Sequence, residues 1–502
     1  MAAADSLIRA GPLCQGNKVS LSQTAAAPAE LPSLLGRSMR RLGTLLITVS
    51  AITPAASVFV MGQDVIHMAG SGAIICFAAA ALLGVVTAYV YAELGSAFPL
   101  TGGEYSIVSR TLGPSSGLMM LALNLFGGAL GQAVFALGLA EYLKVVIPGV
   151  DALVAALAVT AGTTVMTLLN IRLNALVTGI FLSVELAALA AITGLGFASP
   201  HQPLTGLLLH PVAATGGGLA PTSLTAIGLG AAAAVFVFNG YGSAIYFGEE
   251  MHEPRTALPS VVFWALGVAV VAEMAPVVAA LVGMRDPSVV LASERPLPVF
   301  LLEAGGPLAQ KVVSLAVAAS IVNAMIAIGL GNARQLYCSG RDGVWPTPVS
   351  RALASVHPRF HSPWIATLAM GTATAGACFL SLDLLVMLTA TGIVLIYVGV
   401  CIAAIAGRRT GSSRAGTYRM PLYPLVPLAA LAGLAAVVAA NALDADVGRP
   451  SLLANVAVMA IAFGYYALYL RRRGGWTLSG ADGRSLDELE AESLAAQANA
   501  TM

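Results

Sequence analysis

Long apolar stretches, separated by short polar or Pro/Gly-rich segments, make up most of the sequence between residues 43 and 470. A helix needs roughly 20 apolar residues to cross the ~30 Å hydrocarbon core of a bilayer. The pattern predicts twelve transmembrane helices and therefore an all-α integral membrane protein. The predicted spans are 43–68, 71–98, 117–147, 151–169, 173–197, 222–248, 258–283, 309–336, 364–381, 384–406, 424–440 and 452–470.

Composition points to the same class of protein. Of the 502 residues, 58% are hydrophobic and 10% are charged, and the mean hydropathy is +0.85. An ordinary soluble domain carries about a quarter charged residues. The five cysteines are scattered, so they predict neither a disulfide framework nor a metal site. The basic residues form no single patch that would bind nucleic acid, and the expected partners are the lipid bilayer and a small-molecule substrate, with the oligomeric state left open.

The two ends of the chain differ from its apolar centre. The first forty residues lack the continuous apolar stretch of a secretory signal. We therefore expect a flexible cytoplasmic tail over 1–40, a transmembrane domain over 41–473 and a cytoplasmic tail over 474–502. With a cytoplasmic amino terminus, twelve spans leave 20 of the 25 basic residues inside and five outside, which agrees with the positive-inside rule. The five outer residues are Lys144, Arg285, Arg295, Lys311 and Arg449.

Two predicted spans carry residues that break helices. The first contains Pro54, which lacks an N–H and disfavours helical angles at Thr53. The sixth contains the run Asn239 to Ser243, where two glycines admit backbone angles closed to other residues. In lipid, an unpaired backbone group costs several kcal/mol, so a span is interrupted only where protein or a water-filled cavity satisfies the freed groups.

The two interruptions together favour a binding site. Spans one and six stand in corresponding positions if the first ten helices form two five-helix repeats, which is typical of a transporter site near the bilayer midplane. Unpaired N–H groups attract a carboxylate, and unpaired carbonyls attract an ammonium group. A zwitterion would suit both. Either break alone is equally well explained as a packing kink.

Three segments carry a resemblance to a known family. They are AELGSAFPLTGGEYSIVSRTLGP (92–114), FNGYGSAIYFGEEMHEPRTALPSVV (238–262) and RQLYCSGRDGVWP (334–346). With them, the chain from about residue 41 to 475 resembles the amino acid permeases of the amino acid-polyamine-organocation (APC) superfamily. The resemblance implies two inverted five-helix repeats plus two C-terminal helices, the APC fold, working by alternating access in the plasma membrane.

The resemblance also implies site residues. The first break would hold the substrate carboxylate on its amides, and Phe236 and Phe238 would close an aromatic surface over the substrate. The implied substrate-binding residues are Thr53, Pro54, Ala55, Ala56, Ser57, Phe236, Phe238, Asn239, Gly240, Tyr241 and Gly242. Two positions depart from the family: the first break reads Ala-Ala-Ser where many members have Gly-Ser-Gly, and Gly242 stands where several have an acid. The missing acid favours a neutral amino acid.

Two glutamates lie inside predicted spans, Glu185 in the fifth and Glu273 in the seventh. Charged residues at this depth are usually paired, protonated or functional, and burial favours a carboxyl that exchanges protons near neutral pH. We expect Glu185 either to couple protons or to form a structural hydrogen bond. Glu273 could exchange protons or satisfy carbonyls freed by Pro276. No cofactor is expected beyond H⁺ or Na⁺ as coupling ion.

Several further residues in or beside the predicted spans each fit more than one role. Asn323 in the eighth span could line the site or join helices, and Gly127 and Gly131 fit a packing face. Glu104 and Arg110 could form a gating ion pair after the second span, with the segment 249–255 as its counterpart after the sixth.

The resulting hypothesis is a secondary transporter of an amino acid, driven by a proton or sodium gradient. An amine or polyamine permease and an amino acid exchanger remain alternatives, as do a channel and a non-transporting sensor. An enzyme is not expected, because the spans contain no histidine pair, aspartate dyad or Ser/His arrangement of a catalytic site.

Overall fold

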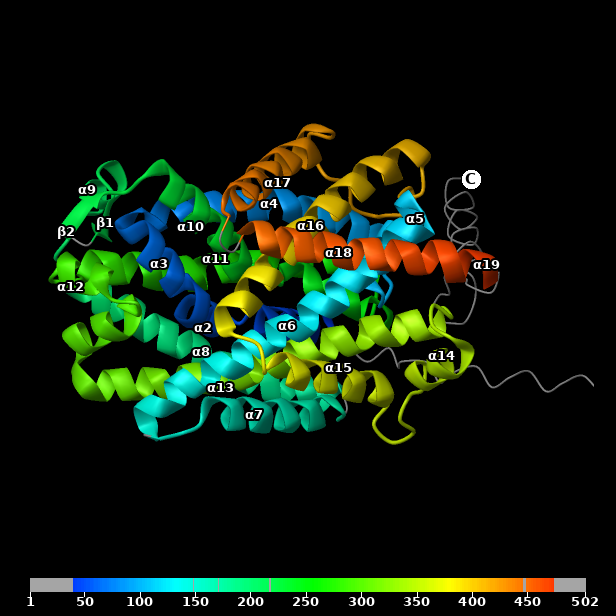
Figure 1. The fold of residues 1–502 in the computed structure, drawn as a ribbon, viewed down its shortest axis with the longest axis horizontal. Coiled ribbons are helices and arrows are strands. Elements are labelled where there is room, and N and C mark those ends of the chain that lie inside the picture. Colours follow the sequence, from blue (N-terminus) through cyan, green and yellow to red (C-terminus); the bar gives the residue numbers. More distant parts are fainter. Residues whose placement is uncertain (1–38, 148, 170, 216–217, 446–447, 474–502) are drawn as a thin grey trace, which may run out of the picture. The chain divides into compact units, whose positions relative to one another are not determined.

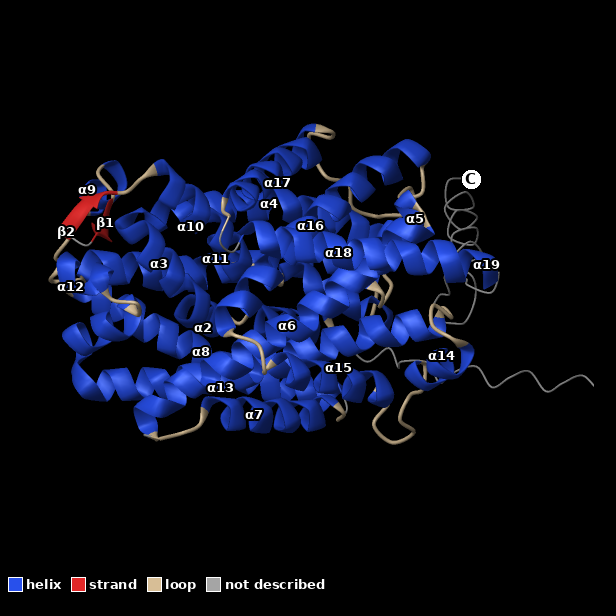
Figure 2. Ribbon diagram, viewed as in Figure 1, coloured by secondary structure: helices blue, strands red, loops and turns tan. Residues whose placement is uncertain are grey.

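A computed structural model describes residues 39–147, 149–169, 171–215, 218–445 and 448–473. The protein is all-α, with 81% of the described residues helical, and the strands among these residues form a single two-stranded hairpin (Figure 2). Nearly all of the predicted tails, 1–40 and 474–502, lies outside the described residues.

Nine helical segments of the described chain are long and apolar enough to cross a membrane. They are Arg41–Ala97, Pro114–Ala140, Leu176–Ala198, Leu224–Glu250, Pro254–Gly283, Pro296–Arg341, Leu384–Thr410, Leu425–Leu443 and Gly448–Arg473. The first combines the first two predicted spans, which a turn at Gly70 separates. Such a set of helices is that of an integral membrane protein with multiple spans.

Helix occupies each of the twelve predicted ranges (Figure 1). The first half contains α1 Arg41–Ile52, α2 Pro54–Ala56, η1 Ser57–Gly62, α3 Gln63–Ala69, η2 Gly70–Gly72, α4 Ala73–Ala97, α5 Gly103–Leu112, α6 Pro114–Val146, α7 Ala152–Thr167, α8 Ile171–Ala198 and α9 Leu204–Leu209. The hairpin follows as β1 Val212–Thr215 and β2 Gly218–Pro221. In β1 and β2, Val212 pairs with Pro221 and Thr215 with Gly218.

The second half continues with helices up to the end of the described chain. It contains α10 Leu224–Val237, η3 Tyr241–Glu250, α11 Pro254–Gly283, α12 Pro287–Ala292, α13 Pro296–Arg341, α14 Thr347–Leu353, α15 Trp364–Ala377, α16 Leu382–Thr410, α17 Leu425–Leu443, α18 Gly448–Tyr465, η4 Tyr466–Leu470 and α19 Arg471–Arg473. α13 is longer than the predicted span because a second helix precedes it across Gly306, whose φ of 73 bends the chain.

Local sequence explains where several helices begin. Pro114 and Pro254 occupy the first turn of α6 and α11, where the missing N–H costs nothing. Asp151 and Ser223 cap α7 and α10, each accepting a hydrogen bond from an amide in the first turn. These residues fix the helix starts on which the spans depend.

The interrupted first helix lies at the centre of the packing. α1 packs against α8, α11 and α13, and α10 packs against α3, α4 and η1. Buried apolar side chains from both interrupted spans belong to one core, among them Ile52, Phe59, Phe236 and Phe238. The hairpin, α9 and α12 lie at one end of the bundle, and α5, α14 and α19 lie at the other (Figure 1).

Candidate functional site

The first span is interrupted at Thr53. α1 ends at Ile52, Thr53 adopts left-handed angles (φ 57, ψ 61), and the chain resumes through α2 and the π-helical turn η1. Pro54 explains the break, because the residue before a proline avoids helical angles. The Ser57 hydroxyl donates to the freed carbonyl of Ile52 at 2.8 Å, so this exposed backbone group is satisfied inside the protein.

The sixth span is interrupted at Gly240. α10 ends at Val237, Gly240 has a φ of 118, and the chain continues as the 3₁₀ helix η3. A Cβ at Gly240 would lie 3.0 Å from the Cα of Ile52. Glycine is therefore needed both for its backbone angle and for the close approach. The two breaks touch each other at this point.

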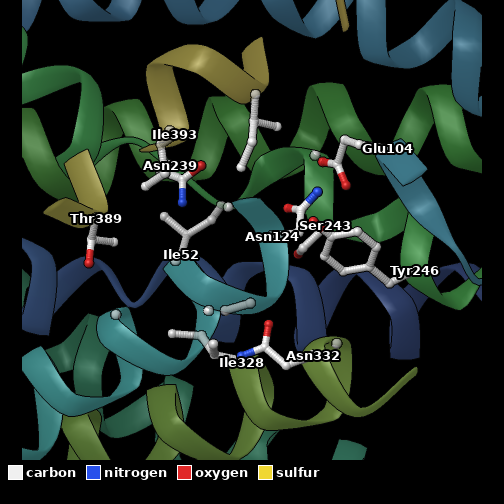
Figure 3. A pocket seen from close by; sticks show the side chains of 18 of the residues that line it. Ile52, Glu104, Asn124, Asn239, Ser243, Tyr246, Ile328, Asn332, Thr389 and Ile393 are labelled. Carbon is white, nitrogen blue, oxygen red and sulfur yellow. The ribbon is translucent and has the colours of Figure 1, made fainter. Parts of the chain in front are cut away.

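A cavity of about 130 Å³ lies beside the two breaks. Its lining comes from α1, η1, α4, α5, α6, α10, η3, α13 and α16, together with Asn239 and Gly240. Glu104, Ser243 and Tyr246 lie toward one side of it, and Asn239 and Thr389 lie toward the other (Figure 3). Apolar side chains such as Phe236 supply much of the remaining wall. Such a mixed, largely apolar hollow with a few polar groups is typical of a small-molecule site.

The predicted site residues divide between the cavity wall and the layer behind it. Ser57, Phe236, Asn239, Gly240 and Gly242 line the cavity. The others are buried around it: Thr53, Pro54, Ala55, Ala56, Phe238 and Tyr241.

Phe238 and Tyr241 lie outside the cavity lining, although the Tyr241 ring contacts the lining residues Tyr91 and Tyr397. Phe238 forms an edge-to-face contact with Phe77, with ring centroids 5.6 Å apart. The Tyr241 hydroxyl hydrogen-bonds to Thr87. Both side chains therefore support the broken sixth span from behind.

Glu185 contacts the first break directly. Its Oε1 accepts a hydrogen bond of 2.7 Å from the amide of Ala55, and its side chain is fully buried. One of the amides expected to bind a substrate carboxylate is thus bound here by a carboxyl group of the protein itself. This contact is compatible with both predicted roles of Glu185. It is a structural hydrogen bond, and it also connects a carboxyl that could carry a proton to the backbone of the first break.

Glu273 and Asn323 also lie near this break and outside the cavity lining. Both are fully buried. The Glu273 oxygens have no hydrogen-bond partner among the described residues. Glu273 therefore forms no hydrogen bond that would satisfy carbonyls freed by Pro276. The Asn323 side chain on α13 faces Glu185 on α8, which agrees with its predicted role in joining helices.

Several cavity residues were not predicted from the sequence as site residues. Tyr91 packs against Gly242, where a Cβ would lie 2.6 Å from its ring, and its hydroxyl donates to Glu104 at 2.9 Å. Burial raises the pKa of the Glu104 carboxyl. Glu104 thus brings an acid into the cavity lining next to the position where Gly242 lacks one. The Gly-Gly-Glu run at 102–104 marks this position in the sequence, where the pattern predicts a gating ion pair instead of a cavity residue.

Small residues of α6 also line the cavity. Gly127 has open space where a side chain would stand, whereas Gly128 lies against Asn332, with a Cβ position 2.5 Å from its Oδ1. Gly127 and Gly131 both belong to the lining. The predicted packing face is therefore, in part, a wall of the cavity.

Ion pairs join η3 to the end of α13. Arg341 pairs with Glu249 at 2.7 Å, and Arg334 pairs with Glu250 in a contact that leaves both side chains 2% exposed. The Arg334 guanidinium also lies over the Phe247 ring. The counterpart segment predicted after the sixth span does carry ion pairs, and its basic partners come from α13.

Comparisons with known proteins give the family. The amino acid permease family model matches residues 40–464. An uncharacterized transporter of Mycobacterium tuberculosis is 27% identical over 352 residues, covering 69% of this chain and 75% of the relative. The methylthioribose transporter of Bacillus subtilis is 24% identical (80% and 87% covered), and a branched-chain amino acid permease of Lactococcus lactis is 26% identical (74% and 82% covered). The chain belongs to the amino acid permease family of the APC superfamily, whose members are membrane transporters and not enzymes.

Proposed function

We propose that this permease is a secondary active transporter that moves a neutral amino acid across the plasma membrane by alternating access, coupled to a proton or sodium gradient. The observation that carries the proposal is the cavity beside two touching helix breaks. Broken helices expose backbone donors and acceptors that suit the two charges of a zwitterion. A cavity of about 130 Å³ suits a small substrate.

For the membrane topology, we propose twelve spans with both termini in the cytoplasm, built as two inverted five-helix repeats plus two C-terminal helices. The permease domain would cover 41–473 between tails 1–40 and 474–502. Two observations support this topology. Helix occupies every predicted range. The hairpin, α9 and α12, which belong to predicted outer connections, lie at the opposite end of the bundle from α5 and α14, which belong to predicted inner connections (Figure 1). The basic residues favour the end with α5 and α14 as the cytoplasmic one.

For substrate binding, we assign direct contacts to Ser57, Phe236, Asn239, Gly240 and Gly242. The remaining predicted residues of the two breaks would hold the unwound backbone in place. Phe236 would supply the aromatic surface that closes over bound substrate. Its side chain lines the cavity and is 8% exposed, so a substrate could cover it fully.

For ion coupling, we assign the proton to Glu185. Its hydrogen bond to the Ala55 amide connects a buried carboxyl to the first break. A change in the protonation of Glu185 would strengthen or weaken that bond, and a change in the break would alter the affinity of Glu185 for a proton. This reciprocity is what coupling requires.

One observation favours an amine or polyamine as the alternative substrate. Glu104 lines the cavity beside Tyr91 and Tyr246. A carboxylate in this position could bind a second amino group. The exchanger alternative rests on the shared fold alone.

The decisive test is uptake into proteoliposomes containing the purified protein. A panel of radiolabelled neutral amino acids, cationic amino acids and amines would be offered with proton and sodium gradients imposed separately. We expect gradient-driven accumulation of a neutral amino acid. Accumulation of amines alone would transfer the assignment to the alternative, and exchange without accumulation would identify an exchanger. Flux far above carrier rates would indicate a channel.

A further inference from the structure

A buried polar cluster lies behind the first break and outside the cavity lining. It consists of Glu185 on α8, Glu273 on α11, and Ser320 and Asn323 on α13, all at most 1% exposed. Within the described part of the chain, the side chains of Ser320 and Asn323 face the Glu185 carboxyl, whereas neither oxygen of Glu273 has a hydrogen-bond partner. Buried polar atoms are normally satisfied. The buried Glu273 carboxyl, without a partner beside a second carboxyl, is therefore a candidate proton-binding group.

The two glutamates lie at the same depth on adjacent helices. α8 and α11 approach closely at their ends, where a Cβ on Gly283 would lie 2.7 Å from the Cα of Gly196. Glu185 precedes Gly196 by 11 residues, and Glu273 precedes Gly283 by 10. At a rise of ~1.5 Å per residue, the two positions differ in depth by roughly one residue. Glu273 is also within electrostatic range of Glu185.

Among the described side chains, no basic group acts on either carboxyl. The groups that act on Glu185 are the Ala55 amide of α2 and the polar side chains of Ser320 and Asn323 on α13. The one basic residue within the bounds of α8 in the sequence, Arg172, stands 13 positions before Glu185, or ~20 Å along the helix. On the α13 side, Lys311 is nine residues before Ser320 and exposed. Two adjacent buried carboxylates without a counter-charge cannot both stay ionised.

We propose that Glu185 and Glu273 form a carboxyl pair that binds a single proton between them, and that this pair is the proton site of the transporter. The inference rests on the proposed proton coupling and adds Glu273 to it. Because the Ala55 amide donates to Glu185, the negative charge stays on Glu185 and the proton resides on Glu273. When the break rearranges and this amide leaves, the proton passes from a Glu273 oxygen to Glu185, and the charge moves to Glu273. Ser320 and Asn323 are the positioning residues.

The test compares Glu185→Gln, Glu273→Gln and the double variant in proteoliposomes, with Glu294→Gln as the control because Glu294 is an exposed carboxylate between α12 and α13. Proton-driven accumulation and substrate counterflow are measured for the same amino acid. Counterflow requires no net proton movement, so it shows whether a variant is folded and binds substrate. We expect each single variant to lose most proton-driven accumulation and to keep counterflow. The double variant should show the same loss of accumulation as either single variant. The control should match the wild type.

Infrared difference spectroscopy of the purified protein gives a second reading that needs no substrate. The wild type should show a protonated carboxyl signal at neutral pH that Glu273→Gln removes. If Glu273→Gln keeps full proton-driven accumulation while Glu185→Gln loses it, the pair is refuted. Loss of counterflow in both variants, or accumulation driven by sodium instead of protons, would also overturn it. If no amino acid is transported at all, the proposed function fails, and the infrared signal still decides whether the pair binds a proton.

Discussion

The buried ion pair between Arg334 and Glu250 gives the sharpest stability prediction. Both side chains are 2% exposed, and the pair connects α13 to the end of η3. Replacing Arg334 with Met leaves the Glu250 carboxylate buried without its partner, which should cost ~3–5 kcal/mol. Replacing both residues, in Arg334→Met/Glu250→Leu, removes both buried charges and should recover most of that loss. The prediction is specific because adding Glu250→Leu to Arg334→Met should raise the stability of the protein instead of lowering it further.

The assay is thermal unfolding of the detergent-purified protein at one fixed scan rate, because unfolding of a large protein is often irreversible. Arg419→Met is the matched control: Arg419 is 43% exposed and lies 3.5 Å from Glu93, so its loss should cost less than ~1 kcal/mol. The reasoning is refuted if Arg334→Met melts like the wild type. It is equally refuted if the double variant is no more stable than the single one.

Three further predictions concern the cavity. Phe236→Ala should weaken substrate binding by removing the aromatic wall, and unchanged affinity in a binding assay would count against the gate assignment. Gly240→Ala should lower stability by ~1–3 kcal/mol and slow uptake, because φ is 118 and the new Cβ would press on Ile52, whereas Gly127→Ala, in open space, should unfold like the wild type. Burial raises the pKa of the Glu104 carboxyl in the folded protein above its value in the unfolded chain. The protonated Glu104 therefore contributes to stability at low pH, and this contribution is lost as the pH rises through the folded pKa. The melting temperature should therefore fall less with rising pH in Glu104→Gln, and equal slopes would contradict this reading.

The helix breaks could be predicted because their causes are local. Pro54 alone constrains Thr53, and the positive φ of Gly240 needs glycine wherever that helix packs. The positions of the apolar spans follow from composition in the same way. These features depend on a few neighbouring residues, and the sequence displays such residues directly.

The residues that line the cavity could not be predicted from the sequence, because they come from helices far apart in the chain. Asn124, Asn332 and Tyr397 reach the cavity only because α6, α13 and α16 have particular rotations about their axes. Apolar spans show little periodicity, so the pattern does not reveal which face turns inward. Likewise, Glu185 could be recognised as unusual from its position in lipid, but its partner Ala55 is 130 residues away.

The serine at the first break has a consequence for affinity. Its hydroxyl holds the Ile52 carbonyl, and Glu185 holds the Ala55 amide, so the unwound segment keeps its form while the chamber is empty. Because the segment is already ordered, little of the substrate's interaction free energy has to offset the cost of ordering it. Replacing Ser57 with alanine should therefore make the first break more mobile in the substrate-free protein and lower the affinity for substrate.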